Sequence, residues 1–300
     1  MLVDGGPKSA GDDVVAFLKS QNIKVIDYVV ATHPDADHIG GLIDVFAAFK
    51  VNDFVNSGKV HTTETYEELL TAAANEGSTY IEPTVGQFID LDPALQVQVL
   101  HVNSEAEECN DSSIVLKVTY NKLTFLLTSD ADTNIESQIA SKFNVQSAIL
   151  KAGHHGSDTS TSLSFLQKVK PSVTILSYGN DNSYGHPVDD VVSSLRSVNS
   201  RIYSTAQSGT ITITTDGSSY TVWAVEYRGS GNPSKSFDDQ DTGTDIIPNV
   251  PTETDVIPNA PTTFKNCTEM RVYYPNGVSS EHPAYDKKHD RDGDLWACEK

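Results

Sequence analysis

The chain has 300 residues, of which 38% are hydrophobic, and its formal net charge is −20. This length is enough for one large domain and a small one, and the sequence has no apolar run of about 18 residues that would predict a transmembrane segment. Broad affinity for a nucleic-acid backbone needs clustered Lys and Arg, so the charge argues against it. A nuclease is still compatible with this charge, because bound metal ions can hold a phosphate locally.

The first residues predict short elements that lead to a central strand. Residues 1–6 read as a strand that ends in Asp4 and two glycines, and residues 12–21 have the apolar spacing of a helix. Residues 26–32 are mostly apolar and β-branched, which predicts a buried strand. We find no secretory signal at Met1.

A turn rich in metal-ligand side chains follows this predicted strand. Within six residues it holds two imidazoles and two carboxylates, and two glycines follow: His33, Asp35, Asp37 and His38. Open α/β sheets bind ligands at the carboxyl ends of their strands, and these side chains suit zinc, manganese or iron. The spacing therefore predicts a metal site, and the alternative is a polar turn. Residues 42–49 predict a helix after it.

The motif at residues 33–38 resembles the His-x-His-x-Asp-His signature of the metallo-β-lactamase-fold hydrolases. Asp35 stands where the second histidine is usual, and this variant is similar to the hydrolase domain of the ComEC-type competence proteins. The resemblance implies an α/β fold, an αββα sandwich, in which Asp4 supports the metal site. Family members normally have two or three strands before Asp4, so we expect either an N-terminally truncated fragment or a reduced sandwich.

The rest of the large region contains further predicted helices and strands. We expect helices at residues 63–75 and 188–198. Strands are expected at residues 53–56, 87–91, 96–102, 113–120, 123–128, 147–151, 172–177, 201–204, 210–215 and 220–225.

Four later turns carry further motifs of the resembled family. Residues 109–113 are similar to its Asn-x-x-Ser turn, which implies Asn110 and Asp111 as ligands or substrate contacts and Ser113 as a hydrogen-bond donor. An ordinary polar turn is the alternative. Asp130 corresponds to the carboxylate that bridges two metals.

The remaining two motifs contain histidines. His154 and His155 lie in a Gly-His-His-Gly-Ser run; one should complete the second metal site, the other should orient it or contact the substrate, and the choice stays open. His186, in a Tyr-Gly-His-Pro turn, is implied as a substrate-side acid or phosphate contact, and a turn histidine without a role is the alternative.

The C-terminal part divides into a linker and a small module. We expect the hydrolase domain at residues 1–228, a Pro/Thr/Asp-rich disordered linker at residues 229–263 and the module at residues 264–300. Two cysteines that close such a module, Cys267 and Cys298, suggest a disulfide and an extracellular setting. Alternating acids and a later glutamate form a calcium-loop pattern: Asp290, Asp292, Asp294 and Glu299.

This module resembles the excalibur calcium-binding region, and the alternative is an acidic, solvated tail. The whole chain therefore predicts a secreted or surface-bound bacterial hydrolase that uses one or two zinc or manganese ions, with Asp37 orienting the attacking water. DNA is the favoured substrate, because the ComEC-type group is linked to DNA processing. The alternatives are a phosphocholine-type hydrolase of cell-wall phosphoesters and a non-catalytic, calcium-dependent surface-binding protein. For each of these functions, the C-terminal module is a candidate for attachment to the cell wall.

Overall fold

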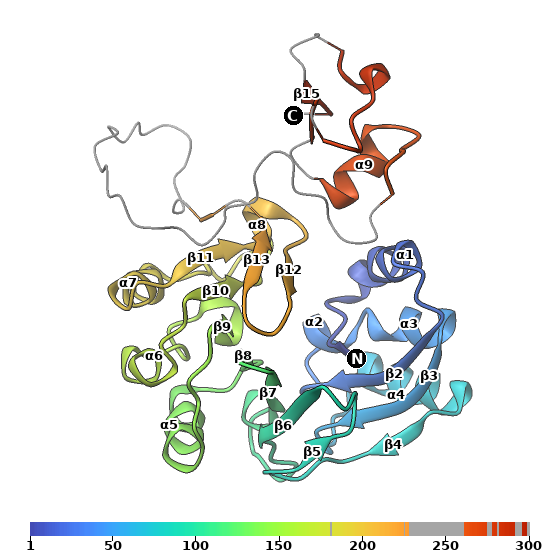
Figure 1. Ribbon diagram of the computed structural model, residues 1–300. Coiled ribbons are helices and arrows are strands. Elements are labelled where there is room, and N and C mark those ends of the chain that lie inside the picture. Colours follow the sequence, from blue (N-terminus) through green and yellow to red (C-terminus); the bar gives the residue numbers. More distant parts are fainter. Residues whose placement is uncertain are drawn as a thin grey trace. The chain divides into compact units, whose positions relative to one another are not determined.

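The computed structural model describes residues 1–180, 182–224, 226–227, 261–274, 278–280, 282–291 and 296–298. The chain forms two compact units, Met1–Ile202 and Tyr203–Lys300, which are coloured along the sequence in Figure 1. The predicted linker, residues 229–263, lies almost wholly outside the described residues, and three of the predicted calcium ligands lie outside them too: Asp292, Asp294 and Glu299.

The first sheet of the first unit has four parallel strands in the order β1-β2-β3-β4. Its strands are β1 (Leu2–Val3), β2 (Val25–Ala31), β3 (Lys50–Asn56) and β4 (Thr79–Ile81). The segments between them contain η1 (Lys8–Ala10), α1 (Gly11–Ser20), α2 (Ala36–Ile39), α3 (Leu42–Ala48) and α4 (Glu64–Glu76). The predicted central strand and its following helix thus correspond to β2 and α3.

The second sheet has seven strands in the order β11-β10-β9-β8-β7-β6-β5. They are β5 (Phe88–Ile89), β6 (Leu95–His101), β7 (Val115–Tyr120), β8 (Leu123–Leu127), β9 (Ile149–Lys151), β10 (Val173–Leu176) and β11 (Arg201–Ser204). Strands β5 to β8 are antiparallel, whereas β8, β9 and β10 are parallel. The parallel part needs helical crossovers, and these are α5 (Thr133–Lys142), α6 (Leu163–Val169) and α7 (Asp189–Ser197), which lie side by side in Figure 1.

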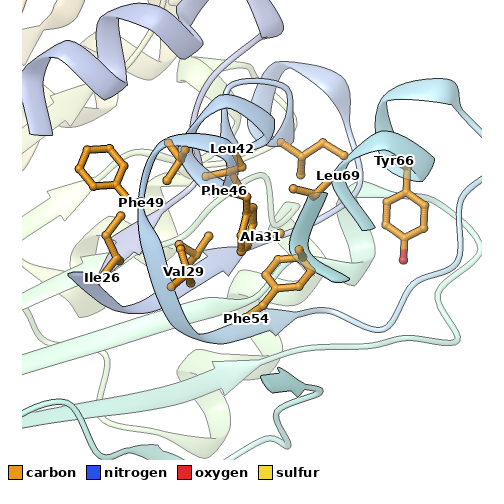
Figure 2. Packing of buried hydrophobic residues seen from close by; sticks show 13 residues of the cluster. Ile26, Val29, Ala31, Leu42, Phe46, Phe49, Phe54, Tyr66 and Leu69 are labelled. Carbon is orange, nitrogen blue, oxygen red and sulfur yellow. The ribbon is translucent and has the colours of Figure 1, made fainter. Parts of the chain in front are cut away.

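Neighbouring residues of β2 and β3 face two different cores. Val29 and Phe54 pack with side chains of α3 and α4, as Figure 2 shows. Val30 and Val55 pack instead against the second sheet, in one cluster with Val97, Val99 and Leu116. Because side chains alternate along a strand, one face of the first sheet is covered by helices and the other by the second sheet. The predicted αββα sandwich is therefore confirmed.

The second unit contains small elements. Its hairpin consists of β12 (Thr212–Thr215) and β13 (Tyr220–Trp223), preceded by α8 (Thr205–Ser208). Its C-terminal part contains α9 (Cys267–Tyr273), η4 (Lys287–His289) and the paired strands β14 (Val278–Ser279) and β15 (Trp296–Ala297). Cys267 and Cys298 form a disulfide beside a small core that includes Phe264 and Met270. Within the described ranges, every helix is too short or too polar to span a lipid bilayer.

Candidate metal centre

The predicted hydrolase residues gather at one edge of the sandwich in the first unit. Each group follows the carboxyl end of a strand or, in one case, precedes β7 within the 3-10 turn η2 (Asn110–Ser112). Asp4 follows β1, residues 33–38 follow β2, and Asp130 follows β8. The histidine pair follows β9 in the 3-10 turn η3 (Gly153–Gly156), and His186 comes after β10. The fold thus brings residues that are far apart in the sequence to one place.

One group of ligand atoms is fully buried. His33, His38 and Asp130 each offer one atom, and these atoms lie within 4.8 Å of one another. Asp130 Oδ2 is 3.3 Å from His38 Nε2 and 3.9 Å from His33 Nε2. Two imidazole nitrogens and one carboxylate oxygen are ligands that zinc and manganese accept.

A second group shares His38 and reaches toward solvent. It consists of Asp37, His38 and His155, again with ligand atoms within 4.8 Å of one another. His155 Nε2 is 3.3 Å from Asp37 Oδ2 and 3.2 Å from His38 Nε2. The carboxylate side chain of Asp37 is 57% exposed, so this group is the one that water and substrate can reach.

The partners of His38 and His155 fix which ring nitrogen of each carries a proton. His155 Nδ1 lies 2.7 Å from the carbonyl oxygen of Ser177, and His38 Nδ1 lies 2.7 Å from Asp4 Oδ2. Both oxygens can only accept, so both Nδ1 atoms donate. The Nε2 atoms, which face the group, are then the ones available to a cation.

Asp4 acts on His33 as well, through Thr32. The Thr32 hydroxyl donates to Asp4 Oδ2 at 2.8 Å, and the Thr32 amide donates to Asp4 Oδ1 at 2.9 Å. Because its only hydrogen is used, the hydroxyl can only accept from His33 Nδ1, which lies 3.1 Å away. Asp4 thereby leaves the Nε2 atoms of both His33 and His38 free to bind a cation.

Two buried atoms of the first group lack a partner. Among the described residues, His33 Nε2 and Asp130 Oδ1 make no hydrogen bond although both atoms are inaccessible to solvent. A buried polar atom that stays unsatisfied costs about 1–3 kcal/mol. A divalent cation would satisfy both atoms, so the side chains at this edge fit a transition metal.

The charges around His38 match such a site. Burial works against the charged form of His38, but the carboxylates of Asp4 and Asp130 outweigh it and raise the His38 pKa to about 10. Burial of Asp130 is likewise outweighed by its contact with His38, which holds the Asp130 pKa well below its usual range. The hydrogen bond from His155 lowers the pKa of Asp37 to about 2. A cation that binds His38 Nε2 must therefore displace a proton.

The other predicted residues lie around these groups. Asp35 Oδ2 is 3.6 Å from His33 Nε2, and His154 Nε2 is 3.7 Å from Asp130 Oδ2. Asp130 N donates to the Ser113 hydroxyl at 3.3 Å, so Ser113 acts here as an acceptor. The ring of His186 lies 5.8 Å from that of His154. His155 thus belongs to a close ligand group, whereas His154 lies at its margin.

A cavity of about 590 Å³ opens beside Asp130 and His154. Asn110, Asp111 and the half-buried free thiol of Cys109 are in its wall. Five carboxylates contribute to the lining: Asp35, Glu108, Asp111, Asp130 and Asp132. The wall is therefore strongly acidic, and burial raises the pKa of the Asp111 carboxyl.

Glu136 supports the loop after the histidine pair, a role that the sequence analysis missed. This fully buried carboxylate of α5 accepts hydrogen bonds from the amides of Thr161 and Ser162 and from the Ser162 hydroxyl. Thr161 in turn accepts from the Gly153 amide at 3.1 Å. Burial raises the pKa of Glu136 to about 7. The signal in the sequence was a single acid on the apolar side of α5, beside Ile135 and Ile139.

Comparison with known proteins assigns the family. The profile of the Metallo-beta-lactamase superfamily matches residues 1–180. The chain belongs to this superfamily. The Excalibur calcium-binding domain matches residues 264–299, so both predicted resemblances are confirmed.

Several individual proteins are similar to parts of this chain. The chain is 33% identical over 208 residues to ComE operon protein 3 of Bacillus subtilis, which covers 68% of this chain and 27% of that protein. Over 38 residues it is 68% identical to the SPbeta prophage-derived endonuclease YokF of Bacillus subtilis, 13% of each chain. The metallo-beta-lactamase fold protein YhfI from Bacillus subtilis aligns with a TM-score of 0.45 and 12% identity, over 67% of this chain and 82% of that chain. The chain spans about a quarter of the length of the first three curated relatives that it matches.

Proposed function

We propose that this metallo-β-lactamase-fold protein is a metal-dependent phosphodiesterase that cleaves DNA outside the cell or at its surface. The observation that carries the proposal is the pair of buried, unpartnered ligand atoms, His33 Nε2 and Asp130 Oδ1, within a His/Asp cluster. Similarity to competence proteins and, over a short stretch, to an endonuclease supports DNA as the substrate.

In this proposal the buried side chains bind metal, and the exposed carboxylate of Asp37 also contacts the attacking water. His33 and Asp130 would belong to one metal site, and Asp37 and His155 to a second; His38 lies in both groups, but its single available nitrogen, Nε2, would bind only one of the two ions. A metal bound there would supply a water with a pKa of about 7 and a charge that polarises the phosphoryl oxygen. Asp37, the exposed carboxylate with a pKa of about 2, stays ionised and accepts a hydrogen bond from the attacking water.

His186 contacts the substrate in this proposal. Its ring centroid lies 5.8 Å from that of His154, and its buried Nδ1 makes no hydrogen bond within the described residues. Burial lowers the pKa of His186, so the neutral ring keeps one N–H that can donate to a phosphate or leaving-group oxygen. Asp35 and His154 complete the ligand sets, and Asn110, Asp111 and Ser113 line or support the approach.

The C-terminal module places the enzyme outside the cell in this proposal. A disulfide is typical of oxidising compartments, and Cys267–Cys298 closes this module. The match to a calcium-binding domain supports calcium in this module, and in this proposal its ligands are Asp290, Asp292, Asp294 and Glu299. Within the described residues, Asp290 accepts a hydrogen bond from the Tyr285 hydroxyl at 2.7 Å. The module is then the part that attaches the enzyme to the cell wall.

The acidic cavity favours a second candidate substrate. Five carboxylates beside the metal ligands attract a positive charge, and the choline group of a cell-wall phosphoester carries one. A phosphocholine-type hydrolase would place that group in the cavity and its phosphate at the metals.

Metal analysis and hydrolysis assays test these proposals together. We expect one or two zinc or manganese ions per chain and turnover of bis-p-nitrophenyl phosphate. Degradation of linear DNA supports the nuclease, whereas intact DNA with choline released from teichoic acid favours the second candidate. A chain that binds metal and turns over none of the three substrates is a surface-binding protein, and the enzymatic proposal fails.

A further inference from the structure

The most exposed large apolar side chain in the described part of the molecule lies beside the metal centre. Tyr184 is 82% exposed, in the turn before α7. Its ring is nearly parallel to that of His186, with an interplanar angle of 11° and a centroid distance of 5.8 Å. His186 in turn lies 5.8 Å from His154, whose Nε2 is 3.7 Å from Asp130 Oδ2. A line of rings thus leads from solvent to the metal ligands.

The turn that carries Tyr184 is held in place. Asn182 Oδ1 accepts from the His186 amide at 2.8 Å, and Asn182 Nδ2 donates to the His186 and Gly179 carbonyls at 2.9 Å. Gly185, which stands between Tyr184 and His186 in the sequence, has a φ of +77°, a conformation that favours glycine. The exposed face of Tyr184 is therefore presented by a fixed turn, which reduces the entropy lost when a ligand stacks on it.

We infer that Tyr184 and His186 form a stacking platform for a base of single-stranded DNA next to the phosphate that is cleaved. The inference rests on the proposed phosphodiesterase function and names the form of its substrate. Any base can stack on an aromatic ring, and such contacts contribute about 1–3 kcal/mol per base. His186, between Tyr184 and His154, then lies where the adjoining phosphate must pass.

Charge explains why the strand runs over this platform. The described lining of the neighbouring cavity contains five carboxylates and neither Lys nor Arg. This wall repels the phosphates of a strand, and the chain as a whole has a net charge of −20. Stacking does not depend on positive charge, so an aromatic platform can hold DNA where an acidic surface cannot attract its backbone.

Two matched strands test the platform. The manganese-loaded full chain is assayed on a single-stranded oligonucleotide and on a strand of equal length with abasic sites throughout. In Tyr184→Ala, the preference in KM for the base-containing strand should fall at least fivefold. Tyr184→Phe keeps the ring and should restore it. Phe88→Ala removes another exposed aromatic ring, 57% exposed on β5, and serves as the control.

Binding measured by fluorescence anisotropy separates this inference from the function on which it rests. A wild-type chain that hydrolyses bis-p-nitrophenyl phosphate but does not distinguish the two strands in either KM or affinity overturns the platform alone. An equal rise in KM for both strands in Tyr184→Ala also overturns it, because loss of the turn's structure would act on both. If the wild-type chain binds the base-containing strand tenfold more tightly than the abasic strand, and Tyr184→Ala loses this difference in affinity, the platform is supported even without turnover.

Discussion

Asp4 controls two histidines although it belongs to neither ligand group. It accepts directly from His38 and reaches His33 through the Thr32 hydroxyl. Its own backbone has a φ of 57°, a left-handed conformation that aspartate tolerates better than most residues. One carboxylate therefore sets the free Nε2 atom of both rings. The sequence predicted a supporting role for Asp4 from the family motif, but the route through Thr32 depends on atom positions that no motif contains.

Replacing Asp4 by Asn should weaken metal binding without unfolding the chain. An amide oxygen cannot satisfy Thr32 and His38 as two carboxylate oxygens do, and loss of such a supporting partner typically costs about 10–100-fold in metal affinity or activity. Competition with a chromophoric chelator measures the affinity. Asp27→Asn, at an exposed position of β2, is the control. Equal affinities for wild type and Asp4→Asn would show that Asp4 does not fix the rings.

The ligands themselves should be indispensable. Alanine at His33, Asp37 or Asp130 removes one donor atom from a ligand group, so hydrolysis should fall below detection and bound metal should drop. Circular dichroism should stay unchanged, because each side chain lies at a strand end outside the apolar cores. Turnover at the wild-type rate by any one of these variants would exclude the metal-hydrolase mechanism.

Among the strands and helices, those that bury apolar side chains in a core could be predicted from the sequence. Strand β2 was found because residues 26–32 form an apolar, β-branched run, and helix α3 because Leu42 and Phe46 recur at the spacing that buries one face of a helix. Strand β4 was missed, since three half-exposed residues at a sheet edge carry no such pattern. Helix α6 was missed although Ser162 caps it by accepting from the Phe165 amide. Its seven residues are too few to show a period against the surrounding Ser/Thr-rich turn.

Glu136 ties α5 to the loop after the histidine pair, and this should make stability depend on pH. Its pKa is about 7 in the folded chain, above the ordinary value near ~4.5. A group whose pKa is higher in the folded than in the unfolded state stabilises the fold fully at pH values below its pKa in the unfolded state. This stabilisation is lost as the pH rises through its pKa in the folded state. The free energy of unfolding should therefore fall by up to about 3 kcal/mol between pH 4.5 and 7 from this group.

Glu136→Gln isolates that contribution. Denaturant unfolding across this pH window should show a smaller decline for Glu136→Gln than for wild type, while Glu67→Gln, an exposed acid in α4, should follow wild type. His38 changes stability in the same direction, but between pH 6.5 and about 10, so only the difference between variants is read. Parallel curves for wild type and Glu136→Gln would mean that the carboxylate is ionised without penalty.

For the whole molecule, the C-terminal module should respond to calcium and to reductant while the sandwich does not. A core of about 37 residues is too small to be stable without a metal or crosslink. Its disulfide closes a separation of 31 residues, which corresponds to about 3–4 kcal/mol. Calorimetry of the full chain should show one transition that rises with millimolar calcium and falls in reductant, and another that does neither.

Two cysteine variants check that assignment. Cys267→Ser should abolish the effect of reductant on the first transition, whereas Cys109→Ser, which changes the free thiol of the sandwich, should preserve it. If calcium and reductant leave both transitions where they were, the module lacks both the metal site and the crosslink, and its extracellular placement loses its main support.

The distance along the chain between ligands has a consequence for how the protein folds. His38 and His155 touch across 117 residues, and His33 meets Ser129 across 96. Closing such loops is slow, because their entropy is lost before any contact repays it. A metal ion binds tightly only after both sheets have met, so it stabilises the finished fold and none of the earlier stages. In a growing chain the group of Asp37, His38 and His155 stays incomplete until the segment after β9 has been synthesised, and a metal bound to it would stabilise only the complete fold.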